Sequence, residues 1–249
     1  MKAIILAAGR GSRMKKMTLD KPKCLLELGG YSLLNWQIKA LVRAGISSIT
    51  AVRGYKKELI SNESISYLEN ERWNDTNMVY TLYCAREILK TNTCLVSYSD
   101  IVYHPSIVEA LMNSDGNISI TYDIKWEQLW KERFIDPLLD AESFETSQSY
   151  LKEIGEKPSN ISEIQGQYMG LIKIAPNGWR KIEAFISLLN PRELDKLDMT
   201  SLFKALLKEG ITIKTVPIQG KWCEVDREED IRLYQKRLDF EDEWLHDWR

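Results

Sequence analysis

The sequence predicts an α/β fold in which helices cover both faces of a mostly parallel sheet. Short aliphatic runs closed by glycine or a turn alternate with segments whose apolar residues recur at helical spacing. The first run, KAIILA at residues 2–7, is short, aliphatic after Lys2 and soon followed by glycine, as is typical of a buried strand. Ligands of such sheets bind at the carboxyl ends of the strands, so residues that follow a strand are candidates for a site.

The expected elements follow in chain order, and no repeat or linker divides them. Helix ends are indicated by Gly45 and Gly210, which stand just after helically spaced segments. We expect strands at 2–7, 46–54, 93–100, 117–124, 150–158, 166–174 and 211–220. We expect helices at 31–44, 55–68, 78–89, 104–116, 178–189 and 200–210, and a last helix that follows residue 222 and runs to the C-terminus.

Composition excludes several classes of protein. The chain has 249 residues and a net charge of -2, which gives no reason to expect a nucleic-acid partner. No apolar run approaches the length of a membrane span. Four cysteines without a CxxC pair, together with only two histidines, argue against a structural zinc site. Scattered thiols of this kind predict a cytoplasmic protein with reduced cysteines.

A glycine-rich loop, GRGSR at residues 9–13, follows the first predicted strand directly. Backbone N–H groups of such a turn bind anions, and Arg10 and Arg13 can add charge-assisted bonds to phosphate oxygens. The loop lacks the Lys-Ser/Thr pair of a Walker A motif, and Met14 stands where a dinucleotide fingerprint needs its third glycine. From these residues alone, a phosphate loop and a plain turn are equally good interpretations.

Four further positions have both a chemical and a structural interpretation. Lys23, after Pro22, is either aimed by the proline or part of a solvated basic turn. Asp100 ends a predicted strand, where it could hold Mg²⁺ or simply start a turn. Asp226 could be a second metal ligand, or cap the last helix with Glu229 three residues on, or do both. Lys157 could meet an acceptor phosphate, although a surface turn is the simpler interpretation.

Together these residues resemble a known family. LAAGRGSRM, with Thr18 and KPK at 21–23, resembles the nucleotidyltransferase signature LAAGxGxRLxxxTxxxPK. The resemblance implies a Rossmann-like sheet of the nucleotide-diphospho-sugar transferase type with a small lid or acceptor subregion. It implies one domain over 1–249, with a nucleotide-binding half at about 1–124 and an acceptor-binding, metal-completing half at about 125–249. The order of further motifs also matches: GY at 54–55, the aspartate after the strand at 94–99, EKP at 156–158, YMG at 168–170 and EVD at 224–226.

One departure narrows the subclass. Sugar-nucleotide enzymes carry a PxGxAxAL-type base loop, whereas NDTNMVYTLYCA at 74–85 has neither glycine nor proline. It is more similar to the N-D-x-N-N-x-Y-S-L-Y pattern of phosphocholine cytidylyltransferases and their relatives, as is WKERFIDPLLDAESF at 130–144. This implies transfer of CMP from CTP to a small non-sugar phosphate or phosphonate acceptor of the phosphoglutamine, phosphocholine or aminoethylphosphonate kind, in cell-surface polysaccharide decoration. The alternatives are a sugar-1-phosphate nucleotidyltransferase that uses UTP or dTTP and an inactive nucleotide-binding regulatory subunit.

The resemblance also implies roles for individual residues. Arg13 would hold the β- and γ-phosphates, and Lys23 would bridge the α-phosphate and the incoming phosphate. Asp100 and Asp226 would hold Mg²⁺. The nucleotide-binding candidates are Leu6, Ala7, Ala8, Gly9, Arg10, Gly11, Asn77, Thr81 and Ser99. The acceptor-binding candidates are Trp126, Glu153, Lys157, Tyr168 and Gly170.

The acceptor pocket and the C-terminus leave alternatives open. An aromatic cage for a quaternary ammonium group could come from Tyr122, Trp126, Trp130 and Phe134, but core packing is the favoured interpretation of these rings. A phosphorylated amino acid would instead need charged partners such as Arg133, Asp136 and Glu153. Trp244 and Trp248, at helical spacing near the C-terminus, could dock on the chain's own core or on a second subunit. The oligomeric state stays open, with a homodimer among the alternatives.

Overall fold

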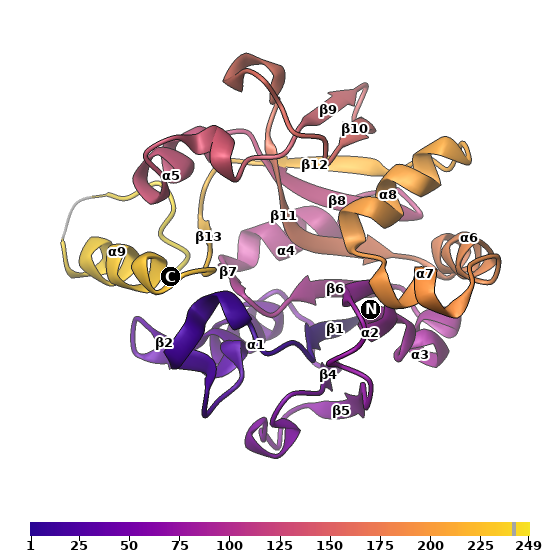
Figure 1. Cartoon of the computed structure of the whole chain (residues 1–249), viewed down its shortest axis with the longest axis horizontal. Coiled ribbons are helices and arrows are strands. Elements are labelled where there is room, and N and C mark those ends of the chain that lie inside the picture. The colour runs from indigo at the N-terminus through magenta and orange to yellow at the C-terminus, as the bar shows by residue number, and fades with distance from the viewer. Residues whose placement is uncertain (241–242) are drawn as a thin grey trace.

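The computed structural model describes residues 1–240 and 243–249. In these residues nine strands form one continuous sheet in the order β5-β4-β1-β6-β11-β8-β12-β10-β9. Strands β11 and β10 run against the direction of all the others, so the predicted mostly parallel sheet is confirmed. Figure 1 shows the N-terminal strands in its lower half and the β9–β10 pair at the opposite end.

The strands are short and bounded by turns. They are β1 (Lys2–Ala7), β2 (Glu27–Leu28), β3 (Tyr31–Ser32), β4 (Ile49–Arg53), β5 (Ser66–Glu69), β6 (Cys94–Tyr98), β7 (Ile101–Tyr103), β8 (Ile118–Asp123), β9 (Phe144–Ser147), β10 (Tyr150–Ile154), β11 (Gln167–Ile174), β12 (Lys214–Ile218) and β13 (Trp222–Glu224). The helices are α1 (Leu33–Arg43), α2 (Met78–Tyr83), α3 (Arg86–Thr91), α4 (Pro105–Met112), α5 (Trp126–Arg133), α6 (Pro176–Ile186), α7 (Pro191–Lys196), α8 (Met199–Lys208) and α9 (Glu228–Asp239).

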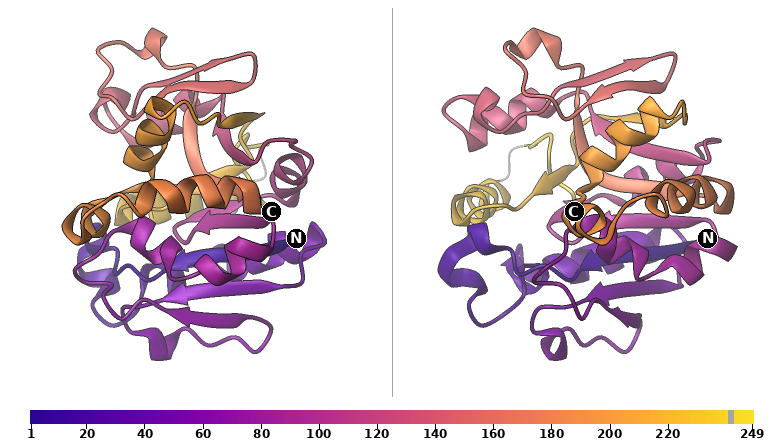
Figure 2. Two further views of the ribbon diagram at one scale, coloured as in Figure 1. Left: turned by 90° about the vertical axis from the view of Figure 1, so that its right-hand side faces the viewer. Right: turned by 45° about the vertical axis from the view of Figure 1, so that its right-hand side comes forward.

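A hydrophobic core lies on each face of the sheet. Because side chains alternate along a strand, Ile5 of β1 packs into one core while Ile4 and Leu6 pack into the other. Helices α1, α4, α5 and α9 contribute buried residues to the first core, and α2, α3, α6 and α8 contribute to the second. The two rotated views show the sheet running between these helical layers (Figure 2). Burial on both faces explains why β1 is apolar at every position after Lys2.

The predicted helix at 55–68 is wrong. The segment contains a single turn at Lys57–Leu59 and then β5, which pairs in parallel with β4 so that Thr50 faces Ser66. The Asn62 side chain accepts a hydrogen bond from the Ser64 N–H at 2.9 Å, which favours a turn over a helix there. The helix predicted at 78–89 is divided into α2 and α3.

The predicted C-terminal helix is also too long, because α9 ends at Asp239 and residues 243–249 are not helical. Residues 241–242 lie outside the described part of the chain. The tail nevertheless packs on the chain's own core, as favoured: Trp248 is buried beside Trp36 and Tyr234, with ring centroids 6.0 and 6.5 Å away. Among the described residues, no helix is both long and apolar enough to cross a membrane.

Candidate active site

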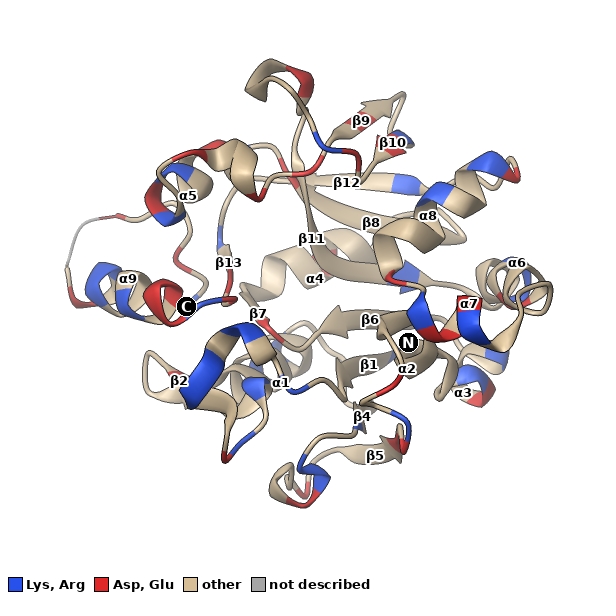
Figure 3. Ribbon diagram, viewed as in Figure 1, with Lys and Arg blue, Asp and Glu red and all other residues tan. Residues whose placement is uncertain are grey.

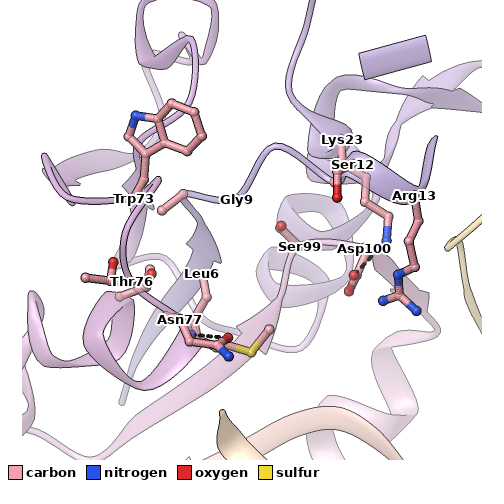
Figure 4. Close-up of a pocket in the computed structure, with 14 residues that line it drawn as sticks. Leu6, Gly9, Ser12, Arg13, Lys23, Trp73, Thr76, Asn77, Ser99 and Asp100 are labelled. Carbon is pink, nitrogen blue, oxygen red and sulfur yellow. Dashed lines mark hydrogen bonds and ion pairs between the residues drawn. The ribbon is translucent and has the colours of Figure 1, made fainter. Parts of the chain in front are cut away.

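A cleft of about 270 Å³ opens at the carboxyl ends of β1 and β6. Figure 4 shows Lys23, Arg13 and Asp100 together on one side of it and Trp73, Thr76 and Asn77 on the other. One end of the cleft is therefore charged, and the other is aromatic and polar. Its lining residues are Leu6, Ala8, Gly9, Gly11, Ser12, Arg13, Lys23, Trp73, Thr76, Asn77, Met78, Thr81, Ser99 and Asp100.

The glycine-rich loop after β1 is shaped around Lys23. Gly11 adopts a left-handed conformation with φ +74°, and a Cβ atom there would lie 2.7 Å from both Cβ and Cδ of Lys23. The Gly11 carbonyl accepts hydrogen bonds from the Met14 N–H at 3.0 Å and the Thr18 hydroxyl at 3.1 Å. Glycine is therefore required here both for the backbone conformation and for the close approach of the lysine.

Lys23 joins two carboxylates that are distant in the sequence. Its ammonium lies 2.9 Å from Asp100 Oδ2 and 2.6 Å from Asp226 Oδ1, and Arg13 Nη2 lies 3.0 Å from the same Asp226 oxygen. Burial by itself lowers the pKa of Lys23, but Asp100 and Asp226 more than offset it, so the net pKa lies above its ordinary value. Burial would raise the pKa of Asp226, yet Lys23 and Arg13 hold it below its ordinary value. Both groups are therefore charged at neutral pH.

These aspartates belong to a three-carboxylate cluster that also includes Glu224. One oxygen from each of Asp100, Glu224 and Asp226 lies within 4.8 Å of the others. Asp100 Oδ1 is buried and has no hydrogen-bond partner among the described residues. Burial and the neighbouring Asp226 raise the pKa of Glu224 well above its ordinary range, and a cation bound at the cluster would favour the charged form of this carboxyl. A hard divalent cation with oxygen ligands fits this donor set.

Neighbouring residues hold the segment that bears Asp226, and Asp230 has the capping role at the last helix that was expected of Asp226. Helix α9 begins at Glu228, and the carboxylate that accepts the free N–H groups before it belongs to Asp230. Asp230 Oδ2 accepts from the N–H of Asp226 at 2.8 Å and of Arg227 at 2.9 Å. Asp226 therefore does not cap the helix, and its Oδ1 contacts both Lys23 and Arg13. Figure 3 shows charged positions gathering where the chain after β1 approaches the β13–α9 junction.

Most of the predicted nucleotide-binding residues reach the cleft. Of the described residues, Ala7 and Arg10 are the two candidates that do not line it. Arg10 instead lies against the Tyr55 ring, 5.8 Å from its centroid. Two lining residues also have structural bonds: the Asn77 side chain accepts from the Met78 N–H at 2.7 Å, and the Thr81 hydroxyl accepts from Asn70 Nδ2 at 3.1 Å.

The predicted acceptor residues are scattered, and none lines the cleft in the described part of the chain. Tyr168 and Gly170 pack against Tyr98, the residue before Ser99 of the cleft: the Tyr168 ring is 5.8 Å from that of Tyr98, and a Cβ on Gly170 would lie 2.7 Å from the Tyr98 ring. Glu153 and Lys157 are exposed and line a separate cavity beside β9 and β10. The structure thus does not bring these two to the cleft.

Of the four aromatic residues considered for a cage, Tyr122, Trp126 and Trp130 are buried in the core and Phe134 is half-buried against it. Trp126 is only 3% exposed and lies edge-on to Trp130 at 5.8 Å, so it does not reach the cleft. Tyr122 stacks on Phe144 at 4.7 Å. The Phe134 ring is covered by the guanidinium of Arg227, 4.1 Å from the ring centroid. Packing, the favoured interpretation, therefore accounts for these rings.

Of the three charged residues considered for a phosphorylated amino acid, Arg133 and Asp136 are engaged in other contacts, and Glu153 lies away from the cleft as described above. Arg133 is buried and bonded to Asp230 and Glu224. The Asp136 side chain accepts from the Leu138 N–H at 3.0 Å, which begins a short turn.

Sequence reasoning missed several residues of the site. Trp73, Thr76 and Met78 line the cleft, although the sequence predicts only Asn77 and Thr81 of this stretch as nucleotide-binding residues. The ring centroids of Trp73 and Tyr55 are 5.1 Å apart. A Cβ atom on Gly54 would lie 2.5 Å from the Cβ of Trp73, so a larger residue at position 54 would displace this ring. A lone tryptophan inside an otherwise polar loop, followed by a family-like NDTN stretch, was the available signal. Glu224 was part of a recognised motif but was not expected among the carboxylate ligands.

Comparison with known proteins establishes the class. A sequence profile of the MobA-like NTP transferase domain matches residues 3–153. The chain therefore belongs to this family and is a nucleotidyltransferase. It is 34% identical to the CTP:phosphoglutamine cytidylyltransferase of Campylobacter jejuni, over 94% of this chain and 98% of that protein. A shorter match, 39% identical, covers 36% of this chain and 41% of the choline-phosphate cytidylyltransferase of Streptococcus pneumoniae.

Solved structures confirm the fold. The CTP:phosphocholine cytidylyltransferase of Streptococcus pneumoniae superposes with a TM-score of 0.71 at 21% identity, over 96% of this chain and 99% of that one. The inositol-1-phosphate CTP transferase of T. maritima gives a TM-score of 0.74 at 16% identity, over 96% of each chain. The Rossmann-like nucleotidyltransferase fold is thus shared over nearly the whole chain.

Proposed function

We propose that the protein transfers CMP from CTP to a small non-sugar phosphate or phosphonate acceptor, with release of pyrophosphate. The observation that best supports this proposal is that Lys23 forms ion pairs with Asp100 and Asp226 beside the glycine-rich loop, at the charged end of the cleft. The similarity to cytidylyltransferases along most of the chain supports CTP as the donor. Phosphorylated glutamine is the first acceptor to test, followed by phosphocholine and 2-aminoethylphosphonate.

The polarity of the cleft suggests how the nucleotide lies. We infer that its base and ribose face Trp73, Thr76 and Asn77 and that its phosphates face Arg13 and Lys23 (Figure 4). N–H groups of the loop and the two cations would then neutralise the triphosphate. Such a site works chiefly by positioning and by stabilising the charge that develops in the transition state.

In the proposed reaction, an oxygen of the acceptor's phosphate or phosphonate attacks the α-phosphorus, and the bond from that phosphorus to the bridging oxygen breaks. Lys23 holds the α-phosphate and the incoming group together, and Arg13 stabilises the leaving pyrophosphate. Asp100 and Asp226, with Glu224 beside them, would hold Mg²⁺. When bound, this ion supplies Lewis-acid neutralisation of the phosphate oxygens.

We further propose that the chain acts as one nucleotidyltransferase domain. Residues up to about 124 would bind the nucleotide, and those from about 125 would bind the acceptor and supply Asp226. We retain Tyr168 and Gly170 as acceptor-side candidates of the second half. Both pack against Tyr98, which precedes Ser99 and Asp100 in the chain. We also propose a cytoplasmic location, which the four free cysteines support. A role in cell-surface polysaccharide decoration is supported by the family resemblance alone.

Two substitutions test the assignment of the charged end. Lys23→Ala and Asp100→Ala should each lower kcat by about 10²-fold or more, because each removes a preorganised charge. Lys21→Ala and Asp115→Ala are the matched controls, since each loses the same charge outside the cleft. Melting curves verify that the variants are folded. A near-normal kcat in either test variant would contradict the assignment.

A pyrophosphate-release matrix tests the substrates. It crosses CTP, UTP, dTTP and ATP with phosphorylated glutamine, phosphocholine, 2-aminoethylphosphonate and sugar 1-phosphates, with Mg²⁺ present or chelated. CTP with one of the non-sugar acceptors should give the highest kcat/KM. A preference for UTP or dTTP with a sugar 1-phosphate would overturn the proposal, and CTP binding without release from any pair would indicate a regulatory subunit.

A further inference from the structure

Arg133 at the end of α5 is a buried cation outside the cleft. Its side chain is 0% exposed. Its Nε and Nη2 donate to the two oxygens of Asp230 at 3.1 and 3.2 Å, and its Nη1 donates to Glu224 Oε2 at 3.1 Å. This bidentate fork is a geometry that arginine can form and lysine cannot. The guanidinium thus holds two carboxylates at fixed positions.

Both of these carboxylates flank Asp226. Asp230 Oδ2, held by Arg133, accepts from the backbone N–H of Asp226 at 2.8 Å. Glu224, also held by Arg133, belongs to the same three-carboxylate cluster as Asp226. Arg133 therefore acts on the residues before and after Asp226 without touching Asp226 itself.

The rest of the surroundings make this support rigid. The Val225 N–H donates to the Asp100 carbonyl at 2.9 Å, which ties the two aspartate-bearing segments together. The Tyr234 hydroxyl donates to the Glu224 carbonyl at 2.8 Å. Arg227 Nη2 donates back to the Arg133 carbonyl at 2.8 Å, so α5 is fixed to the start of α9. Each residue from Glu224 to Arg227 is thus held by at least one bond.

We propose that Arg133 is a positioning residue that, through Asp230 and Glu224, sets the Asp226 carboxylate for the metal ion and nucleotide of the transfer reaction. This inference rests on the proposed function. Groups that orient the ligands of a metal ion without touching it commonly change metal affinity by about 10- to 100-fold when they are lost. Arg133 supports the 224–226 segment through Glu224 and Asp230. Its loss should therefore weaken metal binding more than it weakens binding of the nucleotide's base.

Two conservative variants test the proposal: Arg133→Lys keeps the charge but loses the fork, and Asp230→Asn keeps the shape but weakens the pair. The control is Arg237→Lys, which alters another α5–α9 ion pair, to Glu132 at 3.0 Å, that does not reach Asp226. Mn²⁺ is titrated into each folded protein with CTP present, and free Mn²⁺ is followed by its EPR signal. Turnover is measured over a range of Mg²⁺ concentrations.

The Mn²⁺ dissociation constant and the half-saturating Mg²⁺ concentration should rise about tenfold or more in both test variants and stay near wild type in Arg237→Lys. Turnover of the test variants should recover in part at high Mg²⁺. Unchanged Mn²⁺ affinity in folded Arg133→Lys would overturn the positioning role. Failure of both variants to fold would overturn it as well, since Arg133 would then serve the fold alone. A wild-type protein that neither binds Mn²⁺ with CTP nor transfers CMP would instead refute the proposed function.

Discussion

Replacing Gly11 with alanine should damage both the stability and the turnover of the protein. The left-handed conformation at φ +74° costs a residue with a Cβ about 1–2 kcal/mol. The new Cβ would also stand 2.7 Å from Cβ and Cδ of Lys23, an overpacking that costs about 1–3 kcal/mol. Lys23 cannot swing aside freely, because its ammonium is bonded to Asp100 and Asp226. The sum is about 2–5 kcal/mol of unfolding free energy.

For a chain of this size that loss lowers Tm by about 4–20 °C, and a displaced Lys23 should lower kcat by about 10²-fold. Two glycine variants separate the terms by thermal melting and steady-state kinetics. Gly45→Ala has a positive φ of +88° with open space, so it should lose about 2–8 °C and keep its kcat. Gly9→Ala has neither problem and should keep its Tm. If Gly11→Ala melted no lower than Gly9→Ala and turned over normally, the reasoning about Lys23 would be refuted.

Two further predictions concern buried titratable groups. Burial raises the pKa of all four thiols, of Cys24 to about 12, of Cys94 to about 11 and of Cys223 well above its ordinary value. Because Cys84 alone is half-buried and the other three are buried, a thiol reagent at pH 8 should label native protein at Cys84 alone. Mass spectrometry checks this, and rapid native labelling of any of the other three would contradict it. Burial lowers the pKa of His246 below 6.5, so the unfolded state binds the extra proton and stability falls as pH drops below 6.5, by up to about 1.4 kcal/mol per pH unit. Urea unfolding at pH 7.5 and 5.5 should show a smaller loss in His246→Gln, and an equal loss in both proteins would count against this burial effect.

The glycine-rich loop and Asp100 could be predicted as neighbours in the site because each follows the end of a strand. The strand that ends at Ala7 and the strand before Asp100 are neighbours in parallel, with Leu6 facing Tyr98, so the residues that follow them meet at one edge of the sheet. Lys23 and Asp226 came from the family motifs, because neither the KPK turn nor the EVD stretch specifies a site on its own. Their convergence on one point is a property of the fold that local patterns do not contain.

The acceptor side and the C-terminal tail could be predicted only in part, because long-range packing decides which rings are buried and where the last helix ends. Trp126 has the residue type of a binding ring, but neighbouring rings bury it. Trp244 and Trp248 have helical spacing, but residues 243–249 are not helical. Both rings contact the Tyr234 ring from this irregular segment, so the spacing reflects a shared packing partner. Arg133 was considered as an acceptor ligand, and only the positions of Asp230 and Glu224 assign it elsewhere.

The bridge from Lys23 to Asp100 and Asp226 has a thermodynamic consequence. The lysine is the internal counter-ion of the carboxylates that a metal ion would need, so a metal ion arriving alone would compete with a buried ammonium. A triphosphate offers the lysine a new partner and frees those oxygens. Nucleotide and metal should therefore each raise the affinity for the other by the same factor, as reciprocal linkage requires. Because of this lysine, the nucleotide and the metal ion would bind together more readily than either binds alone.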